Sequence, residues 1–148
     1  MKERLISFTD DMQQASRDGR KTQARRVVEL KYYDYLQFNT DGVWQFEDEY
    51  GDIHDAITKC PYGVVSDRLR SGDLLLEITG LRVERLQEIT VNDSIAEGIV
   101  DKDCTNAGWV IDKCTQRVID TWDSIYAEKH PWKSNPFVWV IEFKRIDK

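Results

Sequence analysis

Alternating hydrophobic and polar positions, together with a few continuous apolar runs, predict a series of short β-strands. The clearest is residues 137–143, where large apolar residues occupy every second position. Gly80 is expected to break or bulge the chain between the two strands that flank it. In chain order, strands are expected at residues 5–8, 27–30, 43–46, near Ile53, 74–79, 82–86 and 137–143.

Apolar residues that recur every three or four positions predict helices. The longest is expected at residues 105–127, and a short one at 90–97 with Thr90 as its cap. Another follows the opening strand, where Thr9 or Asp10 can accept hydrogen bonds from the free amides of the first turn. One face of the long helix is lined by Ile111, Cys114, Val118, Trp122 and Ile125.

The order of these elements is strand, helix, several strands, two helices and a final strand. No regular crossover helices separate the strands, which favours a mostly antiparallel or mixed α+β arrangement over a doubly wound sheet. The chain has 148 residues, the size of one ordinary domain, and shows no repeat, low-complexity tract or linker. We therefore expect a single domain over residues 1–148.

The composition is that of a globular protein, with 41% apolar and 32% charged residues. No apolar run approaches the ~20 residues that a membrane-spanning helix needs, and the first residues contain no stretch that would serve as a signal peptide. Three cysteines without close spacing, Cys60, Cys104 and Cys114, indicate reduced thiols rather than a disulfide framework. We expect a cytoplasmic protein that does not contact a membrane.

The net charge of −6 argues against a non-specific nucleic-acid coat, which needs a positive field. The charge is unevenly distributed, because five basic residues fall within 17–26 and an acidic block occupies 47–55. The two segments can lie on different faces of the protein. Alternatively, the acidic block can repel the ligands that the basic segment attracts.

Spacings typical of a metal or cofactor site are missing from the sequence. Structural zinc sites use closely spaced pairs of ligands, and the two histidines and three cysteines form no such pair. No glycine-rich turn runs into Gly-Lys-Ser/Thr, so there is no phosphate loop. We expect neither a metal nor a cofactor.

The basic segment begins where the first helix is expected to stop. Gly19 suits the left-handed conformation that often follows a helix end. Lys21 comes between this helix end and the next strand, so it should lie at an edge or mouth of the fold. There it can bind phosphate or, if burial lowers its pKa, act as a base or nucleophile. From composition alone, a solvated basic turn is the favoured interpretation.

Four stretches together suggest a family. Gly19-Arg20-Lys21-Thr22, followed by Arg26 after three residues, matches a signature that runs Gly-x-Lys-Thr and then a polar residue and an arginine. The other stretches are Cys60-Pro61-Tyr62-Gly63, residues 82–90 with 96–99, and residues 135–146. All four resemble the ASCH family, in particular a phage and prophage branch of it, and the resemblance spans nearly the whole chain.

The resemblance implies a PUA-like fold, which is a small, strongly curved, mostly antiparallel β-barrel flanked by helices. It also implies a cleft lined by the Gly-x-Lys-Thr segment and an association with RNA or modified nucleosides. The ligand-binding residues that follow from it are Gly19, Arg20, Lys21, Thr22 and Arg26.

One bacterial branch of the family hydrolyses the acetyl amide of N4-acetylcytidine, and other members have been assigned ribonuclease activity. Similarity to that branch implies Lys21 and Glu97 as an acid–base pair. Ala24, however, stands where that branch has a threonine, and alanine has no hydroxyl to attack a carbonyl. Thr22 would share a face with Ala24 in an extended segment and is the nearest replacement.

Three functions follow as alternatives. The first is binding of RNA, a nucleoside or a nucleotide in the cleft. The second is hydrolysis, either of N4-acetylcytidine-type nucleosides or of RNA, and the third is a phage accessory role through a protein partner at the acidic block. Aromatic residues near the basic segment can stack on bases; these are Tyr32, Tyr33, Tyr35, Phe38, Trp44 and Phe46. The missing threonine places binding ahead of catalysis.

Overall fold

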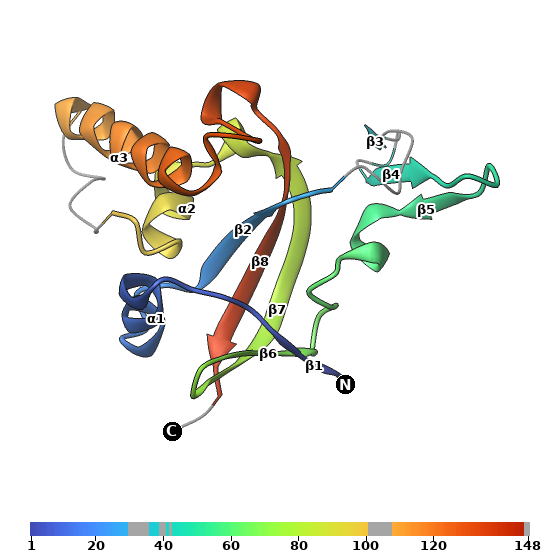
Figure 1. The fold of residues 1–148 in the computed structure, drawn as a ribbon, viewed down its shortest axis with the longest axis horizontal. Helices are drawn as coiled ribbons and strands as arrows, with labels where there is room; N and C mark the ends of the chain where they lie inside the picture. Colours follow the sequence, from blue (N-terminus) through green and yellow to red (C-terminus); the bar gives the residue numbers. More distant parts are fainter. Residues whose placement is uncertain (30–35, 39–40, 42, 101–107, 147–148) are drawn as a thin grey trace.

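The computed structural model describes residues 1–29, 36–38, 41, 43–100 and 108–146. Its largest unit is a five-stranded sheet in the order β1-β6-β7-β8-β2 (Figure 1). β1 and β6 run parallel, and every other neighbouring pair is antiparallel. The strands are β1 (Glu3–Leu5), β2 (Gln23–Val27), β6 (Arg68–Ser71), β7 (Leu74–Arg85) and β8 (Phe137–Arg145).

A second, three-stranded antiparallel sheet is formed by β3 (Leu36–Phe38), β4 (Trp44–Glu47) and β5 (Ile53–Asp55). It contains the hairpin that the sequence predicted between residues 43–46 and Ile53, and it lies to the right of the main sheet in Figure 1. Trp44 packs edge-on against Phe137, with ring centroids 4.6 Å apart. This contact joins the second sheet to the core of the first.

The expected mixed α+β arrangement is confirmed, but the strands of the described residues form no closed barrel. β1 and β2 are the two edges of the main sheet and do not pair with each other. β1 ends after three residues because the chain leaves the sheet to begin the first helix, so nothing continues the ladder towards β2. The main sheet is therefore open rather than barrel-shaped.

The expected irregularity at Gly80 is present in β7, which Figure 1 shows as a bowed strand. The pairing of β7 with β8 shifts between Ile78 and Gly80, which marks a β-bulge. A Cβ atom at Gly80 would lie 2.7 Å from Glu142 Oε2, so a larger residue here would displace the Glu142 side chain on β8. The two strands predicted around Gly80 are one continuous, bent strand.

The described part of the chain contains three α-helices: α1 (Asp10–Arg17), α2 (Val91–Ala96) and α3 (Gly108–Tyr126). Thr9 Oγ1 accepts from the backbone N–H of Met12 at the start of α1, as predicted. Thr90 and Asp93 form the predicted capping box of α2. Residues 105–107, with which the long helix was expected to begin, lie outside the described residues.

β8 is buried on both of its faces, which explains its strongly apolar sequence. One face contributes Trp139, Ile141 and Phe143 to the larger core. On the other face, Val138 and Val140 pack against Trp122 of α3. β8 therefore connects the layer that contains α3 to the rest of the protein, and β2 pairs along its edge.

The cysteines differ from one another in state. Cys60 is a buried free thiol, and burial raises its pKa to about 11. Cys114 is disulfide-bonded, so the expectation of reduced thiols is wrong for Cys114, because sequence spacing does not reveal which side chains the fold brings together. Cys104 lies outside the described residues. Among the described helices, none is both long and apolar enough to cross a bilayer.

Candidate functional site

The basic segment is turned sharply as it leaves α1. Gly19 has φ of +78°, the left-handed conformation predicted for it. The backbone N–H groups of Arg20 and Lys21 both donate to the carbonyl oxygen of Ala15, at 2.9 and 3.0 Å. These bonds satisfy the end of α1 and bring the chain back over it, so Lys21 points inward from the turn.

The end of α2 closes over Lys21. The backbone N–H of Thr22 donates to Ala96 O at 2.7 Å, and Thr22 O accepts from the N–H of Phe143 at 2.9 Å. Gly98, with φ of +81°, approaches so closely that a Cβ atom there would lie 3.1 Å from Lys21 Cβ. Backbone contacts alone therefore place Lys21 between α1, α2 and β8.

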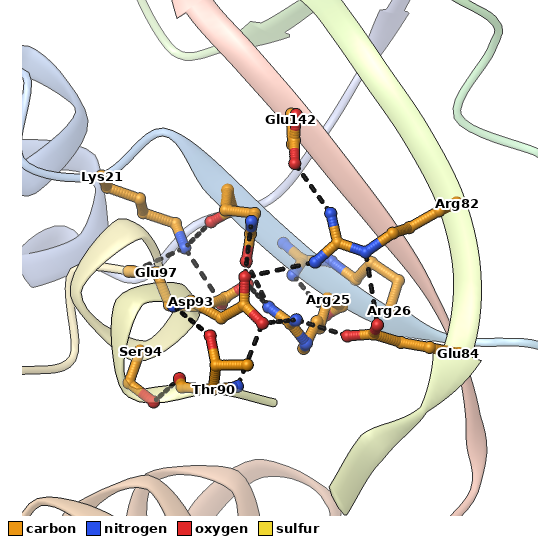
Figure 2. Close-up of polar contacts among 11 residues, drawn as sticks. Lys21, Arg25, Arg26, Arg82, Glu84, Thr90, Asp93, Ser94, Glu97 and Glu142 are labelled. Carbon is orange, nitrogen blue, oxygen red and sulfur yellow. Dashed lines mark hydrogen bonds and ion pairs between the residues drawn. The ribbon is translucent and has the colours of Figure 1, made fainter. Parts of the chain in front are cut away.

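Lys21 is buried, and all three of its ammonium donors find acceptors. Nζ donates to Gln23 O at 2.7 Å, to Glu97 O at 2.9 Å and to Glu97 Oε1 at 3.4 Å (Figure 2). Burial lowers the pKa of Lys21, and the negative charge of Glu97 opposes that shift. The structure thus brings together the two residues expected to form an acid–base pair.

Arg25, which was absent from the expected site, lies at the centre of the same cluster. Its Nη1 donates to Glu97 Oε2 at 3.1 Å, and its Nη2 donates to Glu84 Oε1 at 2.6 Å. Nη2 also lies 3.3 Å from Asp93 Oδ2. Nε is buried and meets no acceptor in the described part of the chain.

Arg82 of β7 extends the cluster towards the surface. Its Nη2 donates to Asp93 Oδ1 at 3.2 Å, its Nε to Glu84 Oε2 at 3.3 Å and its Nη1 to Glu142 Oε1 at 2.7 Å. Figure 2 shows the side chains of β7 (Arg82, Glu84) meeting those of α2 (Asp93, Glu97) around Arg25. We call the whole set the ion network; it consists of Lys21, Arg25, Arg82, Glu84, Asp93, Glu97 and Glu142.

Asp93 is held in its charged form. Burial acts to raise the pKa of Asp93, but hydrogen bonds from Thr90 and Gln23 and the charge of Arg25 outweigh it, so the pKa lies below its usual value. The carboxylates of the ion network are paired with basic side chains instead of converging on one point. In the described residues, no group of three or more His, Cys, Asp and Glu side chains could hold a metal ion.

A cavity of about 470 Å³ opens beside the ion network. Lys21, Arg25 and Glu97 contribute to its polar wall. Apolar side chains make up most of the remaining surface, and four of the lining residues are aromatic: Phe8, Tyr62, Trp122 and Tyr126. Trp122 and Tyr126 stack on each other with centroids 4.3 Å apart, so α3 presents an aromatic wall.

Three basic residues line the cavity, and Arg26 is the one that forms no ion pair with a carboxylate of the described residues. Its Nη1 donates to Arg25 O at 3.0 Å and its Nη2 to Ser7 O at 2.7 Å. Burial raises the pKa of Tyr62, and the charge of Arg26 partly opposes this shift. Arg26 therefore brings to the cavity a positive charge that no carboxylate of residues 1–29, 43–100 or 114–146 pairs.

Other residues of the basic segment lie away from the cavity. Arg20 is exposed and pairs with Asp18 at 3.1 Å. Thr22 is exposed and borders a second, more open hollow of about 340 Å³ near Asp93. Ala24 is fully buried among core side chains, so the position at which the resemblance implies a threonine faces the core. Neither Thr22 nor Ala24 borders the cavity that Lys21 and Glu97 share.

The aromatic residues expected to stack on bases are not the ones found at the cavity. Phe46 is buried in the core, and Trp44 packs on Phe137. Tyr32, Tyr33 and Tyr35 lie outside the described residues, as does the side chain of Phe38. The acidic block lies on the hairpin of β4 and β5. Its role in binding a protein partner stays a prediction.

Neither a family model nor a curated protein sequence matches the chain. Solved structures, in contrast, match the chain in fold. An ASCH domain from Lactobacillus crispatus JV V101 superposes with a TM-score of 0.52 at 12% identity, over 97% of this chain and 79% of that one. Protein EF3133 from Enterococcus faecalis V583, described by the family model DUF984, gives 0.50 at 13% identity, over 99% and 77%. Hypothetical protein PH0355 gives 0.50 at 13% identity, over 99% and 100%.

At such low identity these likenesses concern the fold alone. The chain shares the fold of an ASCH domain, and the expected PUA-like class is compatible with that result. The relation to a phage branch and to the N4-acetylcytidine amidohydrolases stays a prediction, as does the cytoplasmic location.

Proposed function

We propose that the protein binds a nucleoside, either free or as an unpaired base of an RNA, in the cavity beside the ion network. The supporting observation is the combination of an aromatic wall with buried hydrogen-bonding groups around a space of about 470 Å³. That volume lies within the range of roughly 300–1,000 Å³ found for small-molecule sites. Aromatic side chains such as Trp122 and Tyr126 are the usual partners of unstacked bases.

The charges around the cavity favour a base over a phosphate as the enclosed group. Lys21 and Arg25 are already paired with Glu97, and Arg25 is also paired with Glu84. A phosphate at either cation would have to compete with these carboxylates. Arg26 has no such competitor among the described residues, so it is the candidate partner for a ligand oxygen.

Calorimetric titration with the four common ribonucleosides, N4-acetylcytidine and their 5′-monophosphates tests this function. Tyr126→Leu removes part of the aromatic wall, and we expect it to weaken nucleoside binding by about 1–3 kcal/mol, the usual value of one base–aromatic stack. Tyr50→Leu is the matched control, since Tyr50 is exposed on the β4–β5 hairpin. Failure of every nucleoside to bind, or equal binding by both variants, would contradict the proposal.

Hydrolysis of an acylated nucleoside is a second candidate, and one observation favours it. Lys21 Nζ lies 3.4 Å from Glu97 Oε1 in a site where burial lowers the pKa of Lys21. A threonine nucleophile has no place in this arrangement, because Ala24 is in the core. Water would therefore have to attack the acyl carbon with Glu97 as the base, and the departing amine would take a proton from the same pair.

Incubation with N4-acetylcytidine, followed by chromatography, tests the second candidate. Catalysis predicts the release of cytidine and acetate, lost in both Lys21→Ala and Glu97→Gln.

Ala24→Thr adds bulk inside the packed core, so we expect no gain in turnover and a loss of about 1–3 kcal/mol in unfolding free energy. Ala24→Val supplies the same bulk without a hydroxyl. Higher turnover in Ala24→Thr than in Ala24→Val would contradict the packing argument.

A further inference from the structure

Arg25 connects three separate parts of the fold at the wall of the cavity. It belongs to β2, and its guanidinium contacts Glu84 of β7, Asp93 in the first turn of α2 and Glu97 at the end of α2. Figure 2 shows its side chain among these carboxylates. Only 2% of the side chain is exposed, so protein groups rather than water determine the direction of each contact.

The carboxylate of Glu97 divides its two oxygens between two cations. Oε2 accepts from Arg25 Nη1 at 3.1 Å, whereas Oε1 lies 3.4 Å from Lys21 Nζ. The latter separation exceeds the ~2.7–3.2 Å of a typical N–H···O bond. Lys21 also has two closer acceptors, the carbonyl oxygens of Gln23 and Glu97. Arg25 Nη1 is itself shared, because it also donates to Gln23 Oε1 at 2.5 Å. Of the two cations that reach the Glu97 carboxylate, Arg25 makes the shorter contact.

We propose that Arg25 is the positioning residue of the cavity: it orients the Glu97 carboxylate and so determines how Glu97 presents its other oxygen beside Lys21. The planar guanidinium suits this role because its two terminal nitrogens reach carboxylates on different elements at fixed angles. A lysine at this position would keep the charge but lose the fork. Arg25 affects a ligand only if the cavity binds one, as proposed above.

Arg25→Lys separates positioning from charge, and Glu84→Gln is its control. Glu84→Gln weakens a contact of Arg25 Nη2 but leaves the Nη1 contact with Glu97 in place. Thermal unfolding of both variants shows that the compared proteins are folded. A loss of function found only in Arg25→Lys then points to the Glu97 contact.

A ligand-free measurement follows Lys21 itself through the pH titration of its Nζ signal in ¹⁵N NMR. The charge of Glu97 supports the pKa of Lys21 against burial, while nearby Arg26 and the cation at position 25 lower it. If Glu97 turns away in Arg25→Lys, the pKa of Lys21 falls further, because the opposing positive charges remain. We expect that fall in Arg25→Lys and not in Glu84→Gln. An unchanged titration in Arg25→Lys overturns the positioning role.

Titration with cytidine gives the second readout. We expect Arg25→Lys to weaken cytidine binding about tenfold relative to Glu84→Gln, the effect of losing a hydrogen bond to a charged group. Equal affinities of the two variants overturn the role of Arg25 in ligand binding. If the unmodified protein binds no cytidine or other nucleoside, the proposed function fails, and the Lys21 titration still decides whether Arg25 positions Glu97.

Discussion

The ion network and the ion pairs at the edge of the main sheet use the same side-chain types in different surroundings. Arg25 and Glu84 approach to 2.6 Å, and so do Arg70 and Glu3. The side chains of the first pair are 2% and 15% exposed, whereas those of the second are 41% and 46% exposed. Access of water, not distance, is what distinguishes the two regions.

This difference determines what each region does for the protein. Water and salt can replace the partner of an exposed charge, so exposed pairs contribute little to stability. A buried charge whose partner is removed has no such replacement, although forming the pair also costs desolvation of both groups. The position of the ion network beside a cavity is therefore better explained by the alignment of Lys21 and Glu97 than by a gain in stability.

Truncation of a buried cation should have the largest effect. Arg25→Met leaves Glu84, Asp93 and Glu97 with less positive charge nearby, and we expect a loss of about 3–5 kcal/mol in unfolding free energy. Arg70→Met, the same change in an exposed pair, should cost less than about 1 kcal/mol. Urea unfolding of both variants measures the difference. Losses of similar size would remove the distinction between the regions.

Neutralisation of a carboxylate without loss of volume should have a smaller effect. Glu97→Gln weakens two charged hydrogen bonds, and we expect it to cost about 1.5–3 kcal/mol. Glu3→Gln is its counterpart at the surface and should cost less than about 1 kcal/mol. Since both changes preserve shape, the comparison isolates charge. A larger loss for Glu3→Gln in the same urea experiment would be incompatible with the burial of Glu97.

The sequence predicted the fold best where the determining interactions are local. Thr9 and Thr90 cap helices, and Gly19 and Gly80 permit a turn and a bulge, because each depends on neighbouring backbone groups. The open sheet was not predictable in this way. It depends on which strands become neighbours, and the pairing of β1 with β6 rather than with β2 is a long-range contact that no local pattern specifies.

The candidate site could be selected from the sequence only through a resemblance, and its function stays a prediction. That resemblance selected Lys21 and Glu97, which lie together in the fold. Arg25 was missed because its partners come from distant segments, residues 84, 93 and 97. One signal was present: in an extended segment, residues 21, 23 and 25 share a face. The aromatic wall on α3 gave no signal, since Trp122 and Val118 are also typical of an ordinary core-facing helix.

Acid should reveal a moderate contribution from Asp93. Its pKa is lowered in the folded protein, so Asp93 stabilises the fold above the unfolded pKa of ~3.9 and loses that contribution as pH falls through the folded value. Asp93→Asn should therefore flatten the decline of stability below about pH 4. Glu49→Gln makes the same change in net charge at an exposed site. An equal flattening in both variants would trace the decline to net charge.

The smallest effect is expected from the cross-strand pair of Lys144 and Glu77, which lies 3.2 Å apart on β8 and β7. Lys144→Met should cost less than about 0.5 kcal/mol at low salt, because Lys144 is mostly exposed. In 1 M NaCl, where charges are screened beyond ~3 Å, this cost should disappear. The cost of Arg25→Met should persist there, because ions cannot enter the buried network. If salt also removed the cost of Arg25→Met, the network would have to be open to solvent, and Arg25 could not hold Glu97 as proposed.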